Sequence, residues 1–146
     1  MKKIGFVGLG IMGSPMASHL LNMKDIRLLV NDLKKEAVDK LTAQGAESAT
    51  LQEIGASCDV IFLILPNGEI VEDVLFSEGG ISSSIKAGCI VCDMSSVTPA
   101  QSRNFAARLG EFGVSFLDAP VSGGEPGAKD ATLAFMAGGM EHVYQE

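Results

Sequence analysis

A glycine-rich segment directly after the first apolar run constrains the fold more than any other feature of this chain. Lys3 to Val7 is predicted to be a short strand, and Gly8-Leu9-Gly10-Ile11-Met12-Gly13 follows it. Apolar residues then recur at the spacing of one buried helix face. A strand, a G-x-G-x-x-G segment and a helix in this order predict the phosphate-binding turn of a dinucleotide-binding domain.

Each glycine has a physical role in such a turn. Gly8 permits the tight turn, Gly10 lets a pyrophosphate approach the main chain, and Gly13 lets the helix pack closely on the strand. The start of the helix offers unpaired N–H groups and a partial positive charge to the phosphates. Pro15 falls in the first turn, where a missing N–H costs little. A glycine turn without a ligand is the alternative, and the acid after the second strand argues against it.

That acid is Asp32, which closes a second predicted strand, Arg27–Asn31. A carboxylate at this place accepts hydrogen bonds from the adenosine ribose hydroxyls and repels a 2′-phosphate, so NAD is the expected cofactor. Lys34 and Lys35 could receive such a phosphate, so NADP stays possible, although a solvated helix surface is the better explanation of these lysines. Asp32 could also cap the following helix, which is compatible with holding the ribose.

Short apolar runs alternate with helical patterns along the rest of the chain. This alternation predicts an α/β fold with a doubly wound, mostly parallel sheet of the Rossmann type, in one domain over residues 1–146. A capping box, Thr98-Pro99-Ala100-Gln101, starts a helix whose buried face is expected to be Phe105, Leu109 and Phe112. Other helices are expected at Leu51–Ser57 and Glu69–Phe76, and strands at Ala46–Ser48, Val60–Leu65, Ile90–Asp93, Ser115–Ala119 and, after a glycine-rich loop, Thr132–Ala137.

Polar loops follow three of these strands at the edge where ligands of doubly wound folds bind. They are Leu65-Pro66-Asn67, the segment from Ser95 to Pro99, and Ser122-Gly123-Gly124. Ser96 could be a cap or a ligand, and Thr98 is expected to be a cap. The hydroxyl and consecutive N–H groups of Ser122-Gly123-Gly124 can hold a carboxylate without a basic side chain, although an ordinary turn is the alternative.

Composition excludes several other kinds of function. The net charge is −7 with no basic stripe, so neither nucleic acid nor an anionic membrane is an expected partner. The longest apolar run is too short to span a bilayer and the start of the chain does not read as a signal peptide, so we expect a soluble, cytoplasmic protein. Cys89 and Cys92 have redox or zinc spacing. However, residues three apart in a strand face opposite sides, which favours buried thiols and no metal.

Taken together, these segments resemble the 3-hydroxyisobutyrate dehydrogenase (β-hydroxyacid dehydrogenase) family. Gly8 to Leu20 is similar to the opening signature of that family, and Asp118 to Gly124, with its continuation to Gly139, is similar to its substrate-binding segment. The family includes 2-hydroxymethylglutarate dehydrogenase and tartronate semialdehyde reductase (2-hydroxy-3-oxopropionate reductase). 6-Phosphogluconate dehydrogenase is a more distant relative.

The resemblance implies roles for particular residues. Ser122, Gly123 and Gly124 should hold the carboxylate of a small substrate. His19 stands where the family usually has asparagine and is expected to serve packing, and Ala131 stands where a glycine is common, which should alter only a turn. The residues implied to touch NAD or NADP are Gly8, Leu9, Gly10, Ile11, Met12, Gly13, Asp32, Leu65, Pro66, Ile70 and Ser96.

The resemblance also implies a second, all-helical domain that is absent here. Its first long helix would carry the catalytic lysine, beyond Glu146. Lys129 is expected in the loop before the last strand and does not match it, so this chain holds no catalytic residue and should bind cofactor with little or no turnover. The full-length enzyme would be an oxidoreductase, expected to be a homo-oligomer, that moves a hydride between nicotinamide and a 3-hydroxyacid. The alternatives are a non-catalytic dinucleotide-binding module, or an enzyme of the 6-phosphogluconate dehydrogenase or imine reductase type.

Overall fold

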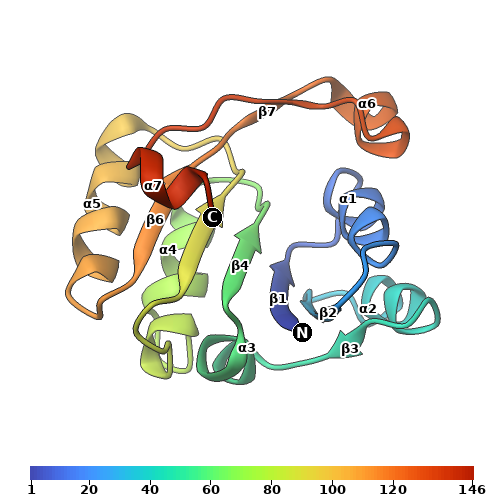
Figure 1. Cartoon of the computed structure of the whole chain (residues 1–146), viewed down its shortest axis with the longest axis horizontal. Coiled ribbons are helices and arrows are strands. Elements are labelled where there is room, and N and C mark those ends of the chain that lie inside the picture. The colour runs from blue at the N-terminus through green and yellow to red at the C-terminus, as the bar shows by residue number, and fades with distance from the viewer.

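Six parallel strands form the central sheet in the order β3-β2-β1-β4-β5-β6, in a computed structural model that describes residues 1–146 (Figure 1). This order confirms the predicted doubly wound sheet. The order reverses between β1 and β4, which is where ligands of such sheets bind. The strands are β1 (Lys2–Val7), β2 (Ile26–Asn31), β3 (Glu47–Ser48), β4 (Val60–Leu63), β5 (Ile90–Asp93) and β6 (Ser115–Asp118).

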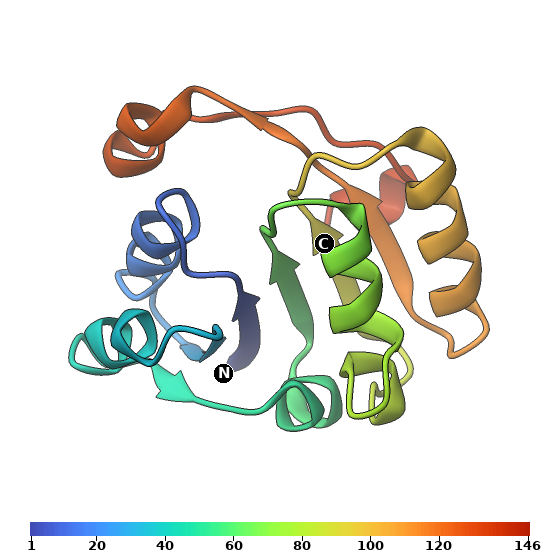
Figure 2. The same ribbon diagram turned by 180° about the vertical axis from the view of Figure 1, so that it is seen from behind.

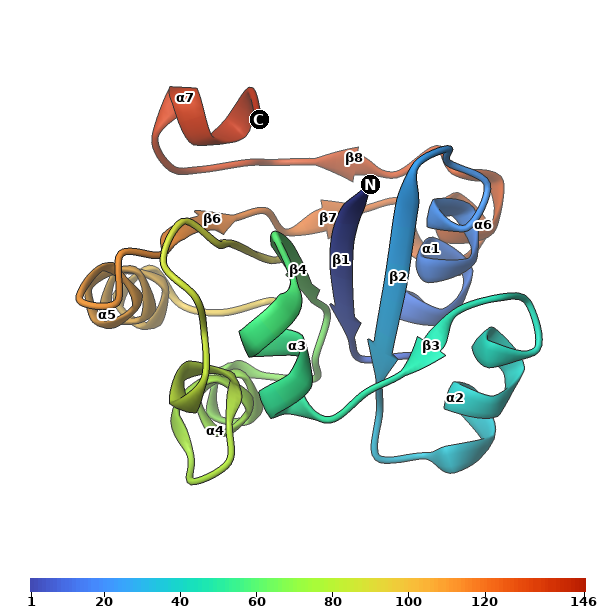
Figure 3. The same ribbon diagram turned by 60° about the horizontal axis from the view of Figure 1, so that its bottom comes forward.

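Helices cover both faces of the sheet, as Figures 2 and 3 show. On one face lie α1 (Gly13–Leu20) and α2 (Lys35–Thr42). On the other lie α3 (Leu51–Ser57), α4 (Gly68–Phe76) and α5 (Pro99–Gly110), with a short 3₁₀ turn at Ile81–Ser83. Two separate hydrophobic clusters fill the two interfaces. Because both faces are buried, the inner strands are almost uninterruptedly apolar.

Local signals explain where several helices begin. Thr98 and Gln101 form both hydrogen bonds of the predicted capping box of α5, with proline in its first turn. Thr50 and Glu53 form a second capping box at the start of α3. These boxes satisfy N–H groups that a helix leaves unpaired at its start.

The chain after β6 differs from the prediction. The expected glycine-rich loop contains a helix, α6 (Gly124–Asp130), and the expected strand Thr132–Ala137 shrinks to β8 (Ala134–Phe135). β8 pairs antiparallel with β7 (Val121–Ser122) outside the main sheet, and α7 (Glu141–Tyr144) follows. The glycines of this segment predict a loop. Of the three glycines between 123 and 130, however, only Gly123 and Gly124 have positive φ, and both lie at the start of α6, so the residues after them are free to form a helix.

Two smaller expectations and one alternative are also wrong. β4 ends at Leu63 rather than Leu65, and the amide of Leu65 donates to the side chain of Ser95 rather than to a neighbouring strand. α5 ends at Gly110, so Phe112 lies beyond it and is 46% exposed. Lys34, and not Asp32, is the N-cap of α2.

The predicted burial of the cysteines is confirmed. Cys89 belongs to the cluster under α3, α4 and α5, whereas Cys92 belongs to the cluster on the opposite face. Burial raises the pKa of each thiol to about 12, so both are protonated and inert. No helix is both long enough and apolar enough to cross a membrane.

Candidate dinucleotide and substrate site

The loops at the carboxyl edge of the sheet are tied to one another by main-chain hydrogen bonds. The amide of Gly8 donates to the carbonyl of Asn31 at 3.1 Å, joining the ends of β1 and β2. The amide of Ile64 donates to Val7 at 3.0 Å, and the amide of Met94 donates to Leu63 at 2.7 Å. The end of each inner strand therefore fixes the loop beside it, and the polar segments of the sequence lie along one edge.

Glycine occupies three positions of the first loop for different structural reasons. A Cβ on Gly8, whose φ is +98°, would lie 2.1 Å from the carbonyl oxygen of Ile64. A Cβ on Gly13 would lie 1.9 Å from the carbonyl oxygen of Gly8. By contrast, a Cβ on Gly10 would meet nothing within 4 Å. The fold therefore requires Gly8 and Gly13, and Gly10 leaves an open approach to the main chain.

The main chain of this loop offers hydrogen-bond donors. The amides of Gly10, Ile11 and Met12 donate to no acceptor in the chain, and Ile11 is 71% exposed. They precede α1, so the partial positive charge of that helix adds to them. Exposed, unpaired amides with no Cβ above Gly10 fit a diphosphate, whose oxygens are acceptors.

Asp32 is held beside this loop by two main-chain hydrogen bonds. Its Oδ2 accepts from the amide of Leu9 at 2.7 Å, and its Oδ1 accepts from the amide of Lys34 at 2.8 Å. Each oxygen retains a second lone pair for a further donor. The side chain of Leu9 is buried in the core, so Leu9 reaches this site only through its main chain. The carboxylate is thus oriented for a hydroxyl-bearing ligand.

The loop after β4 is anchored by a residue that sequence reasoning missed. The amide of Leu65 donates to Oγ of Ser95 at 2.8 Å, and Ser95 is buried. The neighbouring Ser96, the residue singled out in the sequence, is exposed and its hydroxyl bonds nothing in the chain. A signal for Ser95 was available in the sequence. Side chains alternate between the two sides of an extended chain, so Asp93 and Ser95 point to one side and Ser96 points to the other.

Two predicted cofactor residues in the same region, Pro66 and Ile70, are both exposed. Pro66 is exposed at the end of the loop after β4. The amide of Ile70 is used by Oδ1 of Asn67, which caps α4 at 3.0 Å, and the side chain of Ile70 is 36% exposed. Ile70 can therefore contribute only its side chain to a ligand at this edge.

The predicted substrate segment lies where β7, which crosses above the carboxyl edge, leads into α6, which lies beside α1 (Figure 1). Ser122, Gly123 and Gly124 are exposed, and both glycines have positive φ, at 139° and 61°. Leucine packing limits the loop from below, because a Cβ on Gly123 would lie 3.0 Å from a methyl group of Leu133. The backbone is therefore presented outward.

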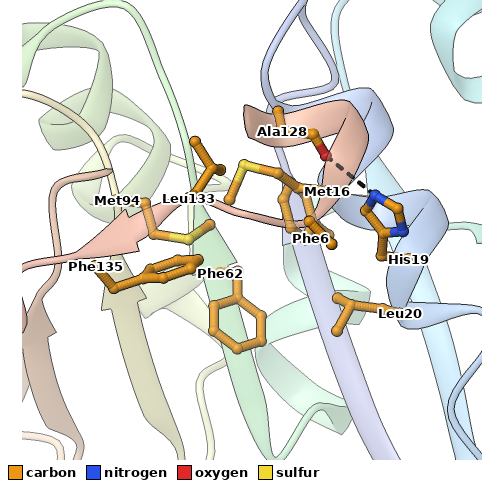
Figure 4. Close-up of a pocket in the computed structure, with 10 residues that line it drawn as sticks. Phe6, Met16, His19, Leu20, Phe62, Met94, Ala128, Leu133 and Phe135 are labelled. Atoms are coloured by element: carbon orange, nitrogen blue, oxygen red, sulfur yellow. Dashed lines mark hydrogen bonds between the residues drawn. The ribbon is translucent and has the colours of Figure 1, made fainter. Parts of the chain in front are cut away.

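His19 joins α1 to α6 and does more than pack. Its Nε2 lies 3.1 Å from the carbonyl oxygen of Ala128 and 2.9 Å from that of Lys129 (Figure 4). Carbonyls only accept, so this nitrogen must carry the proton and donate it. The two carbonyls lie in the last turn of α6, where a helix leaves them unpaired. Helix α1 thus supports the last turn of α6.

Beneath α6, next to His19, lies an apolar cavity of about 220 Å³. Side chains from α1, from the sheet and from the segment after α6 line it (Figure 4). Its lining includes Met16, Phe62, Met94, Leu133 and Phe135. The cavity offers no polar partner other than His19, so it does not hold a charged ligand.

Lys129 lies on α6 and not in a loop, which corrects the expectation for it. Its Nζ pairs with Oε1 of Glu125 at 2.9 Å, one turn earlier on the exposed side of the helix. This hydrogen-bonded carboxylate raises the pKa of Lys129. A general base must instead be neutral near the working pH. Lys129 is thus unsuited to take a proton from a substrate.

Comparison with known proteins gives one matching family. The family described as the NAD binding domain of 6-phosphogluconate dehydrogenase matches residues 3–146. The chain is 43% identical, over 99% of its length, to 2-(hydroxymethyl)glutarate dehydrogenase of Eubacterium barkeri, and covers 48% of that protein. It is 42% identical, over 98% of its length, to 2-hydroxy-3-oxopropionate reductase of Escherichia coli K12, and covers 49% of it.

A solved structure agrees with these sequence matches. The crystal structure of a 3-hydroxyisobutyrate dehydrogenase from Salmonella typhimurium superposes with a TM-score of 0.91 at 31% identity. The match covers 99% of this chain and 50% of that one. The chain thus spans about half the length of the relatives it matches.

Proposed function

The chain belongs to the family of the NAD-binding domain of 6-phosphogluconate dehydrogenase, and from this premise we propose that it is the cofactor-binding half of an NAD(P)-dependent 3-hydroxyacid dehydrogenase. The proposal depends above all on one observation. Three unpaired amides, at Gly10, Ile11 and Met12, lie beside a carboxylate already oriented by two main-chain N–H groups. A diphosphate next to a ribose diol is the ligand that such a pair of features complements.

The cofactor supplies the hydride chemistry, and the residues of this chain bind and orient it. The amides at the start of α1 hold the diphosphate, and Asp32 accepts from the ribose hydroxyls. A negative charge at that place disfavours a 2′-phosphate, so NAD is preferred over NADP. The proposed contacts are Gly8, Leu9, Gly10, Ile11, Met12, Gly13, Asp32, Leu65, Pro66, Ile70 and Ser96.

The substrate is proposed to be a small 3-hydroxyacid held by its carboxylate. The hydroxyl of Ser122 and the N–H groups of Gly123 and Gly124 are exposed at the edge of the sheet where the cofactor would lie. Oxidation of such an acid removes a hydride from the hydroxyl-bearing carbon and a proton from its oxygen. No group at this edge is suited to take that proton, so the base is proposed to lie in the other half of the enzyme.

Titration of the chain with NADH and NADPH, followed by nicotinamide fluorescence, tests the cofactor assignment. NADH should bind more tightly than NADPH. Asp32→Asn should weaken NADH binding roughly 10- to 100-fold, because it removes a charge-assisted hydrogen bond of about 1.5–3 kcal/mol. Asp73→Asn, an exposed aspartate on α4 without an ion pair, is the matched control and should bind as the wild type. Equal affinities for the two cofactors would contradict the role given to Asp32.

Turnover tests the division of labour between the halves. The chain by itself should bind NAD and oxidise little or no hydroxyacid, and hydroxyacid-dependent formation of NADH would refute that. A non-catalytic binding module would show no turnover even when the natural full-length protein is assayed. A reducing compartment such as the cytoplasm and a homo-oligomeric full-length enzyme complete the proposal.

A further inference from the structure

Two aspartates outside the proposed cofactor contacts, Asp93, which is buried, and Asp118, which is half-buried, lie side by side at the end of the sheet. Asp93 and Asp118 are register partners on the neighbouring parallel strands β5 and β6, so their side chains leave the same face of the sheet. Asp93 has no exposed surface. Oδ2 of Asp93 and Oδ1 of Asp118 are both buried, and neither has a hydrogen-bond partner. Two unsatisfied carboxylate oxygens on adjacent strands are costly unless something lies between them.

The other oxygen of Asp93 is part of a chain of hydrogen bonds that reaches the cofactor edge. Oδ1 of Asp93 accepts from the amide of Ser95 at 3.0 Å. Oγ of Ser95 in turn accepts from the amide of Leu65 at 2.8 Å. Asp93 therefore orients the serine that holds the loop after β4. Asp118 stands at the start of the segment that leads to Ser122.

The electrostatic surroundings favour a proton at this place. Burial raises the pKa of Asp93 to about 6, its hydrogen bonds to Ser95 oppose this, and the negative charge of Asp118 adds to the rise. Burial also raises the pKa of Asp118. Asp118 is the only charged side chain that acts on Asp93, so no cation balances the pair. Two neighbouring carboxyl groups in such a place ionise as a unit, the first proton leaving more easily than the second.

We propose that Asp93 and Asp118 share one proton between their unpartnered oxygens, and that this pair positions the loop after β4 for the cofactor. The proton makes one oxygen a donor, which satisfies both buried atoms with a single hydrogen bond. Asp93 is thus a positioning residue that acts through Ser95 and Leu65. The positioning part of this inference rests on the proposed function, whereas the shared proton does not.

The raised pKa of Asp93 decides whether the stability of the fold rises or falls with pH. Because the pKa of Asp93 is raised in the folded chain, the folded chain keeps this proton at a pH where the unfolded chain has lost it. The unfolding midpoint should therefore fall as the pH rises from about 4 through about 6, and then level off. Above that window two negative charges face each other across β5 and β6.

Asp93→Asn tests the shared proton directly. The amide keeps an acceptor for Ser95 and places an N–H donor where the unpartnered oxygen of Asp93 lies, so it imitates the protonated pair at every pH. The urea midpoint of the wild type should fall between about pH 4 and about pH 6, and that of Asp93→Asn should change much less. Asp118→Asn should behave in the same way, and it carries the test if Asp93→Asn does not fold. Asp73→Asn is the control and should keep the wild-type profile.

Cofactor binding tests the positioning role. Asp93→Asn keeps the acceptor for the amide of Ser95 and should bind NADH within about twofold of the wild type, whereas Asp93→Ala removes it and should weaken NADH binding about fivefold, a coupling of ordinary size for neighbouring sites. Ser95→Ala should also weaken NADH binding, because the amide of Leu65 loses its acceptor.

If the urea midpoints of the wild type and of both asparagine variants changed in parallel with pH, the proposal of a shared proton would be refuted. Equal NADH affinities of the wild type and Ser95→Ala would overturn the positioning role. If the wild type bound no NADH at all, the proposed function would fail, whereas the urea experiment would still decide whether the proton is shared.

Discussion

Alanine at Gly10 should separate cofactor binding from folding. Gly10 does not have positive φ, and its added Cβ would meet no atom within 4 Å. The free energy of unfolding of Gly10→Ala should therefore stay within about 0.5 kcal/mol of the wild type, as for other surface changes. The new methyl group would, however, stand where a diphosphate approaches the main chain. An overpacking cost of about 1–3 kcal/mol corresponds to roughly 5- to 150-fold weaker NADH binding.

Gly13→Ala is the matched variant in which the cost should fall on folding. Its Cβ would lie 1.9 Å from the carbonyl oxygen of Gly8 and 2.9 Å from a methyl group of Ile64. The nearest atom belongs to the main chain, which must move by about 1 Å before the contact is tolerable. We expect a loss of about 3 kcal/mol in the free energy of unfolding, or roughly 6–12 °C in the melting temperature.

Two measurements on the same samples decide between these expectations. Thermal unfolding without cofactor gives the cost to the fold, and NADH titration by fluorescence gives the cost to binding. Gly10→Ala should differ from the wild type only in the titration. If Gly10→Ala bound NADH as tightly as the wild type, the main chain of this loop would not be the surface that holds the diphosphate. An unchanged melting temperature for Gly13→Ala would refute the steric argument.

Three further predictions concern other parts of the molecule. Ala131→Gly should stabilise the fold by about 1 kcal/mol, because Ala131 has a left-handed conformation with a φ of 57°, and a melting temperature about 2–4 °C higher would show it. His19→Leu should cost about 1 kcal/mol and speed hydrogen exchange of the α6 amides, because two carbonyls of α6 lose their donor. His19→Asn keeps a donor and is the control, and equal exchange in both variants would contradict the role of the imidazole. A thiol reagent should leave the folded chain unmodified at about pH 8 and react fully in urea, since burial keeps the thiols protonated, and rapid labelling of the folded chain would contradict that.

Local patterns were sufficient to predict most of the fold. The glycine segment, the capping box at Thr98 and the apolar run of β4 each lie within a few consecutive residues, and each specifies its own backbone. The family resemblance was likewise carried by short contiguous motifs. The match to residues 3–146 confirms it, although the roles of the individual site residues remain predictions.

The errors fall where a residue's neighbours are distant in the sequence. In the sequence analysis Ser96 is favoured over Ser95, because the partner of Ser95 is the amide of Leu65, 30 positions earlier, and only the alternation of sides after β5 points to Ser95. The glycines predict a loop, whereas the structure has the helix α6, whose last turn is supported by His19, 110 positions from Lys129. Glycine content reports what a backbone can do, and tertiary contacts decide which of those conformations is kept.

By itself the sequence determined the order of the elements, the doubly wound sheet and the glycine turn, because these depend on periodicity and backbone sterics within short segments. Only the tertiary structure decided that Asp93 and Asp118 lie side by side with unpartnered oxygens, that Asp32 is held by Leu9, and that α1 supports α6. The physical reason is that a hydrogen bond or a buried charge depends on atoms brought together from separate strands, and their adjacency exists only once the sheet has formed.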